Sequence, residues 1–117
     1  MLSLWKKKIK INYYIIIITI LLFQNIKAED LFNQGKKIFI GEGNCATCHT
    51  LEDANSYGNI GPNLNEIKPE IMRVISAVTN GIGVMPAYEG ELSTEEIKAL
   101  AIYVAQSTNW LLHLGGR

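Results

Sequence analysis

Apolar residues along the chain form one run, interrupted by Asn12 and Thr19, and, further on, three helical stripes. The run occupies positions 11–23 and includes four consecutive isoleucines. In the stripes, residues recur at spacings of three and four, the period of a helix with one buried face. The three sets are Phe32, Gly35 and Phe39; Ile71, Val74, Ile75 and Val78; and Ile97, Leu100, Ala101 and Val104. Because no segment shows the alternation of a strand, the pattern predicts an all-α domain.

Residues that start and stop helices set the limits of these three elements. Asp30 can cap a first helix over about Leu31–Ile40, which glycine and asparagine then end. Pro69 suits the first turn of the second helix. Asn80-Gly81 ends that helix, because glycine adopts the left-handed conformation easily. Ser93-Thr94-Glu95-Glu96 is typical of a capping box at the start of the third helix.

Two segments between the helices predict irregular loops. Residues 50–67 are rich in asparagine, glycine and aspartate, which discourage regular structure. Residues 81–86, with the sequence Gly81-Ile82-Gly83-Val84-Met85-Pro86, predict an extended loop. Long loops inside a compact domain generally wrap a ligand or serve a site.

The first 28 residues have the features of an export signal. Lys6-Lys7-Lys8 precedes the apolar run, and Ala28 precedes an acidic stretch, which is the layout of a secretory signal peptide cleaved after Ala28. A retained membrane anchor is the alternative, although the run of 13 residues is shorter than the about 20 of a spanning helix. Both interpretations place the domain outside the cytoplasm, in the periplasm. They divide the chain into the signal or anchor, 1–28, the folded domain, 29–106, and a C-terminal tail, 107–117.

Composition adds size and charge to this picture. The chain has 117 residues, 48% hydrophobic and 19% charged, which fits one folded domain. Residues 1–28 hold five lysines and no acid, whereas residues 29–117 hold six basic and eleven acidic side chains, a net charge of −5. Without a basic tract beyond the N-terminal segment, the domain lacks the electrostatic pattern of a nucleic-acid-binding protein. A domain of this size has a modest core, and its two cysteines, three positions apart, cannot close a long loop.

The candidate chemistry lies in Cys45-Ala46-Thr47-Cys48-His49, which matches the attachment pattern of c-type heme. Two thiols separated by two residues reach adjacent pyrrole edges from one short helical turn and form thioether bonds with the vinyl groups. The histidine that follows the second cysteine then directs its imidazole at the iron.

Other interpretations of this motif are open at this point. Cys-x-x-Cys also occurs in dithiol redox proteins, where it usually opens a helix after a strand, and no strand is predicted before Cys45. A zinc site needs four ligands, and only Cys45, Cys48, His49 and His113 are available. A chance match of five residues is the third possibility.

Met85, Met72 and His113 are the candidates for a second axial ligand. Met72 lies beside the second apolar stripe, where core packing is its expected role, and His113 lies in the tail. Met85 lies in the 81–86 loop, and Pro86 restricts the backbone directly after it. Histidine–methionine ligation is common in such heme proteins. We therefore expect His49 and Met85 to bind the iron from its two faces, with an open iron position as the alternative.

The order and spacing of these segments resemble the small bacterial class I c-type cytochromes. The resemblance rests on the heme motif, Gly61-Pro62-Asn63-Leu64, residues 81–86 and Leu100-Ala101-Ile102-Tyr103-Val104, and covers about residues 30–106. It implies the cytochrome c fold, in which three to four helices wrap around one covalently bound heme c.

The resemblance also implies particular contacts. The first and last helices are expected to cross at close range through Gly35, Phe39, Leu100 and Tyr103. The Pro62 carbonyl is expected to accept a hydrogen bond from the second ring nitrogen of His49, which would orient the imidazole and make it a better donor to iron. Tyr57, Asn59 and Asn63 are either donors to the heme propionates or ordinary loop residues.

For function, the resemblance implies a periplasmic one-electron carrier rather than an enzyme. Its partners would be redox proteins, such as a dehydrogenase or reductase donor and an oxidase acceptor, and an acidic surface would favour basic ones. Neither nucleic acid nor, apart from the N-terminal segment, a membrane is expected as a partner. A cytochrome subunit permanently bound to a dehydrogenase is an alternative, suggested by the apolar residues 110–114. A heme enzyme or gas sensor is another, if Met85 does not bind iron.

Overall fold

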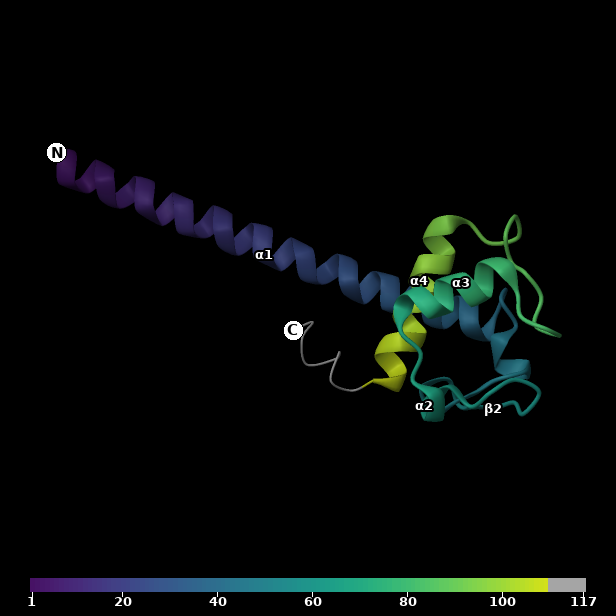
Figure 1. Ribbon diagram of the computed structural model, residues 1–117. Helices are drawn as coiled ribbons and strands as arrows, with labels where there is room; N and C mark the ends of the chain where they lie inside the picture. Colours follow the sequence, from purple (N-terminus) through teal and green to yellow (C-terminus); the bar gives the residue numbers. More distant parts are fainter. Residues whose placement is uncertain (110–117) are drawn as a thin grey trace.

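The computed structural model describes residues 1–109, with the side chains of residues 23–27 excepted. Its α-helices and 3-10 turns, in chain order, are α1 (Leu2–Ile40), η1 (Cys45–Thr47), η2 (Glu52–Ala54), α2 (Leu64–Ile67), α3 (Ile71–Asn80) and α4 (Thr94–Thr108). Figure 1 shows the N-terminal part of α1 projecting from a small domain in which the end of α1, α3 and α4 lie together. The predicted helical class is confirmed.

A small antiparallel sheet is the exception to the predicted absence of strands. Strands β1 (Thr50–Leu51) and β2 (Ser56–Tyr57) pair Thr50 with Tyr57 and Leu51 with Ser56. The buried Ser56 hydroxyl also accepts a hydrogen bond of 3.1 Å from the Leu51 amide. Two residues are too few to show an alternating pattern, so this pairing could not be predicted from the sequence. The expected loop over residues 50–67 is therefore partly ordered into β1, η2, β2 and α2.

The first helix begins far earlier than expected. α1 is continuous from Leu2, so Asp30 lies inside it and does not cap a helix at Leu31. The reason is that no proline or glycine interrupts the chain before Gly35. Large apolar side chains between Leu2 and Leu22 are exposed. Among the helices of the described residues, none is both long and apolar enough to cross a membrane.

The crossing of α1 and α4 forms the core of the domain. A Cβ atom on Gly35 would lie 2.2 Å from the Ala99 carbonyl oxygen and 2.6 Å from the Tyr103 Cβ. Phe39 and Phe32 meet the Tyr103 ring edge-on, with centroids 5.8 Å and 5.0 Å away. The close crossing that the family resemblance implies is thus confirmed, with a backbone approach that only glycine permits.

The structure agrees with the predicted end of α3 and the predicted start of α4, but places the start of α3 slightly later than expected. Gly81 ends α3 at φ +72°, as expected. However, α3 starts at Ile71, two residues after Pro69, because Glu70 is extended with ψ 156°. The Ser93–Glu96 capping box is confirmed, since the Glu96 amide donates to Ser93 Oγ and the Ser93 amide donates to Glu96 Oε2. α4 continues to Thr108, past the expected domain end at 106; His113 and residues 110–114 lie outside the described residues.

Candidate functional site

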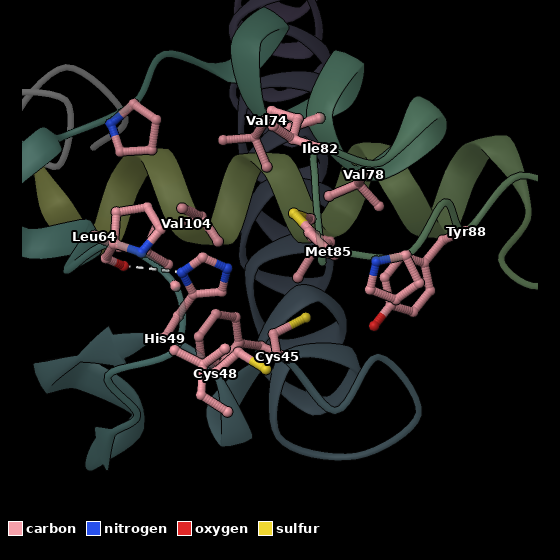
Figure 2. A pocket seen from close by; sticks show the side chains of 18 of the residues that line it. Cys45, Cys48, His49, Leu64, Val74, Val78, Ile82, Met85, Tyr88 and Val104 are labelled. Atoms are coloured by element: carbon pink, nitrogen blue, oxygen red, sulfur yellow. Dashed lines mark hydrogen bonds between the residues drawn. The ribbon is translucent and has the colours of Figure 1, made fainter.

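A cavity of about 510 Å³ separates α3 and α4 from the segment that carries the cysteines (Figure 2). Most of the side chains that line it are apolar. They are Phe39, Ile60, Pro62, Leu64, Ile67, Pro69, Val74, Ala77, Val78, Ile82, Val84, Pro86, Leu100 and Val104, joined by Cys45, Cys48, His49, Met85 and Tyr88. Among the described residues that line it, Arg73 is the only one that is formally charged. The wall is therefore suited to a large apolar ligand with an anionic group at one edge.

The attachment segment, residues 43–49, carries both cysteines and the histidine onto this wall. The turn η1 starts at Cys45, and the amides of Cys48 and His49 both donate to the Cys45 carbonyl, at 3.1 Å and 2.9 Å. Asn44 enters the turn at φ 48°, a left-handed conformation that asparagine tolerates. One turn thus places Cys45, Cys48 and His49 along the same cavity, as the sequence predicts.

Both thiols are free. Burial raises the pKa of the Cys45 thiol to about 11, so at neutral pH this side chain is a protonated, uncharged group in an apolar wall. Within the part of the chain that the structure describes, no group of three or more His, Cys, Asp and Glu side chains is placed to hold a metal ion. The zinc site considered above also required His113, which lies outside that part.

His49 is fixed by the loop that follows it. Its Nδ1 lies 2.9 Å from the Pro62 carbonyl oxygen, the dashed line in Figure 2, so the contact implied by the family resemblance is present. Because a carbonyl only accepts, Nδ1 is the donor in this contact, which leaves Nε2 as the ring nitrogen that can bind a metal. Gly61 packs flat against the imidazole, since a Cβ there would lie 2.5 Å from His49 Cε1. The ring is held in one tautomer and one orientation.

Met85 reaches the cavity from the segment between α3 and α4. This segment is a tight turn rather than the extended loop expected, because Ile82 and Met85 exchange two backbone hydrogen bonds of 3.1 Å and 2.9 Å. Gly81 at φ +72° makes the entry possible: a Cβ there would lie 2.7 Å from the Met85 carbonyl oxygen. Figure 2 shows the Met85 side chain directed into the cavity that His49 also lines.

The other expected site residues have different places. Met72 is 72% exposed, so its expected packing in the core is wrong; it lies beside the buried stripe of α3 but on the solvent side. Tyr57, Asn59 and Asn63 do not line the cavity. Asn63 caps α2 instead, where its side chain accepts a hydrogen bond of 3.0 Å from the Asn65 amide.

Three polar residues of the cavity wall, Asn44, Arg73 and Tyr88, were missed by sequence reasoning. Arg73 lies directly before Val74 of the predicted stripe, and Tyr88 lies three residues after Met85. The position of Arg73 beside an apolar stripe was a usable signal. Nothing in the sequence indicated Tyr88, because Gly43, the residue with which it forms a hydrogen bond, lies 45 positions away.

These residues fit a heme. An apolar cavity presents Nε2 of His49 and the thioether sulfur of Met85, the ligand pair that heme iron takes in cytochromes c. Two free thiols stand on the same wall, one helical turn apart. A helical domain with this donor set is a c-type cytochrome.

Comparison with known proteins identifies the family. Residues 30–104 match the family described as "Cytochrome C oxidase, cbb3-type, subunit III", and the chain belongs to this family, as a small monoheme class I c-type cytochrome. Cytochrome c6 of Leptolyngbya boryana is 35% identical over 74 residues, which cover 60% of this chain and 85% of that protein. The cbb3-type cytochrome c oxidase subunit FixP of Bradyrhizobium sp. (strain ORS 278) is 41% identical over 76 residues, 60% of this chain and 25% of that protein.

A solved structure agrees with this membership. The crystal structure of the c-type cytochrome SorU from Sinorhizobium meliloti shares 51% sequence identity and a TM-score of 0.66, covering 68% of this chain and 93% of that one. The cytochrome c fold that the resemblance implies is thus confirmed. The protein is a heme-containing electron carrier with covalently bound heme c, and it is not an enzyme.

Proposed function

We propose that Cys45 and Cys48 hold the heme through thioether bonds and that His49 and Met85 bind its iron. The observation that carries this proposal is that an oriented imidazole and a methionine sulfur reach one apolar cavity from two separate loops. When bound, the heme supplies an iron that alternates between its ferrous and ferric states with one electron.

The chain's own residues adapt this site to electron transfer. The Pro62 carbonyl accepts a hydrogen bond from His49 Nδ1–H, which raises the electron density of the ring and makes Nε2 a stronger donor to iron. The soft sulfur of Met85 favours the reduced state and raises the potential. The apolar wall acts in the same direction, because it solvates the extra positive charge of the oxidised state poorly. Because His49 and Met85 would both bind the iron, a substrate would find no free position on it.

Replacement of Met85 tests the ligand assignment. Met85→Ala should abolish the methionine–iron absorbance band of the oxidised protein, lower the reduction potential and permit carbon monoxide to bind the reduced protein at neutral pH. Met72→Ala is the matched control, since Met72 is 72% exposed and should leave spectrum and potential unchanged. An unchanged spectrum and potential in Met85→Ala would reject Met85 as a ligand of the iron.

We also propose that residues 1–28 direct export and are removed after Ala28, which leaves a periplasmic carrier. The lysine-rich start and the apolar run support this. The part of α1 that packs on α4 begins near Phe32, and Ala28, Glu29 and Asp30 are exposed, so cleavage there removes none of these packing contacts. Intact-mass measurement of protein secreted by its native host should show an N-terminus at Glu29. An N-terminus at Met1 would instead support a retained anchor.

The partners are redox proteins, a class that the relatives among cytochromes c and cbb3-type oxidase subunits suggest. The net charge of −5 on residues 29–117 favours encounter with basic surfaces, with rates that fall as salt rises. We propose a free carrier rather than a permanent dehydrogenase subunit. Size-exclusion of a native extract should show the heme protein near its own small mass; co-elution with a large dehydrogenase would favour the alternative.

A further inference from the structure

We propose that Tyr88 is a positioning residue that keeps the Met85 sulfur over the heme iron, by fastening the loop that bears Met85 to the attachment segment. This inference rests on the proposed ligand role of Met85. The relevant loop, residues 81–88, is called the methionine loop below.

Most contacts that shape the methionine loop tie it to itself or to α3. The Ile82–Met85 turn is closed by its own two hydrogen bonds, and Gly81 abuts the Met85 carbonyl. The Tyr88 amide donates to the Val78 carbonyl of α3 at 2.8 Å. All of these would persist if α3 and the methionine loop moved together, away from the cysteines.

The Tyr88 side chain makes a contact of another kind. Its hydroxyl donates to the Gly43 carbonyl oxygen at 2.5 Å and so joins the methionine loop to the attachment segment. Among the described residues, it is the hydrogen bond that links these two segments. Tyr88 is half-buried and lines the cavity beside Met85, as Figure 2 shows.

Gly43 is a firm anchor for this bond. It is buried, and its amide donates to the Ile38 carbonyl at the end of α1 at 2.8 Å. A Cβ on Gly43 would lie 2.9 Å from that same Ile38 oxygen and 3.0 Å from the Cys45 Sγ. The acceptor therefore cannot follow Tyr88 outward without disturbing α1 and the first attachment cysteine.

The bond gains importance when heme is attached. The Cys45 thiol is the other donor near this carbonyl, with Sγ 3.5 Å from the oxygen. A thioether has no S–H hydrogen, so in the heme-bound chain the Tyr88 hydroxyl is the donor that remains. His49 and Met85 approach the iron from the attachment segment and the methionine loop respectively, so a bond between these segments holds the two ligands at a fixed separation.

The experiment measures how easily the methionine loop opens in the intact holoprotein. Imidazole, added to the oxidised protein, binds iron only when Met85 has left, so its apparent affinity and binding rate report opening. Tyr88→Phe keeps the ring and removes the hydroxyl. We expect imidazole to bind about fivefold more tightly, the factor that corresponds to loss of one ordinary internal hydrogen bond. Tyr57→Phe is the matched control, because Tyr57 is 76% exposed and does not line the cavity.

Two further variants make the outcome decisive. Tyr88→Ala, which also removes the ring, should open the loop more than Tyr88→Phe; if it fails to take up heme, Tyr88→Phe alone decides. If Tyr88→Phe binds imidazole with the same affinity as the parent, the inference is overturned. This holds even if the urea unfolding midpoint of Tyr88→Phe falls, because a loss of stability alone shows only a structural role. Met85→Ala, run alongside, separates the two claims: if its spectrum matches the parent, the ligand assignment itself has failed.

Discussion

At the scale of single residues, Tyr103 joins three segments of the domain. Its side chain is completely buried, and its hydroxyl donates to Asp53 Oδ2 at 2.8 Å. Asp53 also pairs with Lys36 of α1 at 2.9 Å. Burial, and then the adjoining Asp53 carboxylate, raise the pKa of Tyr103, which keeps the hydroxyl protonated as a donor. This network holds η2, directly after β1, against α1 and α4.

Tyr103→Phe tests the value of that hydroxyl. We expect the free energy of unfolding of the holoprotein to fall by about 1.5 kcal/mol, the low end for a hydrogen bond to a charged group, because the Asp53 side chain is 37% exposed. Urea unfolding followed by far-UV circular dichroism measures it. Tyr57→Phe should change stability by less than about 0.5 kcal/mol. Equal stability of Tyr103→Phe and the parent would show that water replaces the hydroxyl at no cost.

At the scale of elements, the α1–α4 crossing depends on one missing side chain. Gly35→Ala would place a methyl group 2.2 Å from the Ala99 carbonyl oxygen, a backbone atom that cannot turn aside. Such overpacking typically costs about 1–3 kcal/mol and occasionally more. Alanine normally favours a helix over glycine by only roughly 0.5–1 kcal/mol. Because the clash is with the backbone, we expect the cost to exceed this gain.

Thermal unfolding of Gly35→Ala should therefore show a strong loss of stability. Asn33→Ala, an exposed change on the same helix, is the control and should stay within about 0.5 kcal/mol of the parent. A Gly35→Ala protein as stable as its parent would mean that α1 and α4 cross less closely than described.

The capping box of α4 makes the stability of the fold depend on pH, in a direction that follows from the pKa of Glu96. Hydrogen bonds from the Ser93 amide and hydroxyl lower the pKa of Glu96 from its ordinary 4.5. When the pKa of a carboxyl group is lower in the folded protein than in the unfolded chain, its carboxylate stabilises the fold at pH values above the unfolded-state pKa. This contribution is lost as the pH falls through the folded-state pKa. The stabilisation is thus present at neutral pH and disappears below about 4.5.

Glu96→Gln should accordingly be less stable than the parent at pH 7, and this difference should shrink between pH 5 and pH 3. Urea midpoints measured across that range test it. Glu95→Gln is the matched control, since Glu95 lies in the same first turn, and its smaller difference should not follow the same pH profile. A Glu96→Gln difference that stays constant with pH would contradict the capping role.

At the scale of the whole molecule, local signals predicted a large part of the site. Cys45, Cys48 and His49 share one turn, so their common direction follows from spacing alone. The α3 and α4 stripes and the Ser93 cap also follow from neighbouring residues. Met85 was predicted to reach the site because it lies in a loop and Pro86 restricts the backbone directly after it, and the structure does direct its side chain into the cavity.

The features that were missed depend on distant or competing interactions. The start of α1 was misplaced because Asp30 is a good cap, yet nothing upstream of it breaks the helix. The Ile82–Met85 turn is fixed by hydrogen bonds that composition does not encode. The Tyr88–Gly43 bond spans 45 positions, and sequence periodicity carries no information over that distance.

The most direct test of the central claim is a redox titration of the purified holoprotein followed by its absorption spectrum. We expect a single one-electron transition, with a methionine–iron band in the oxidised state that disappears on reduction and heme that stays with the chain after denaturation. A colourless protein from cells able to attach heme, heme released on unfolding, or an oxidised spectrum without the methionine band would contradict it.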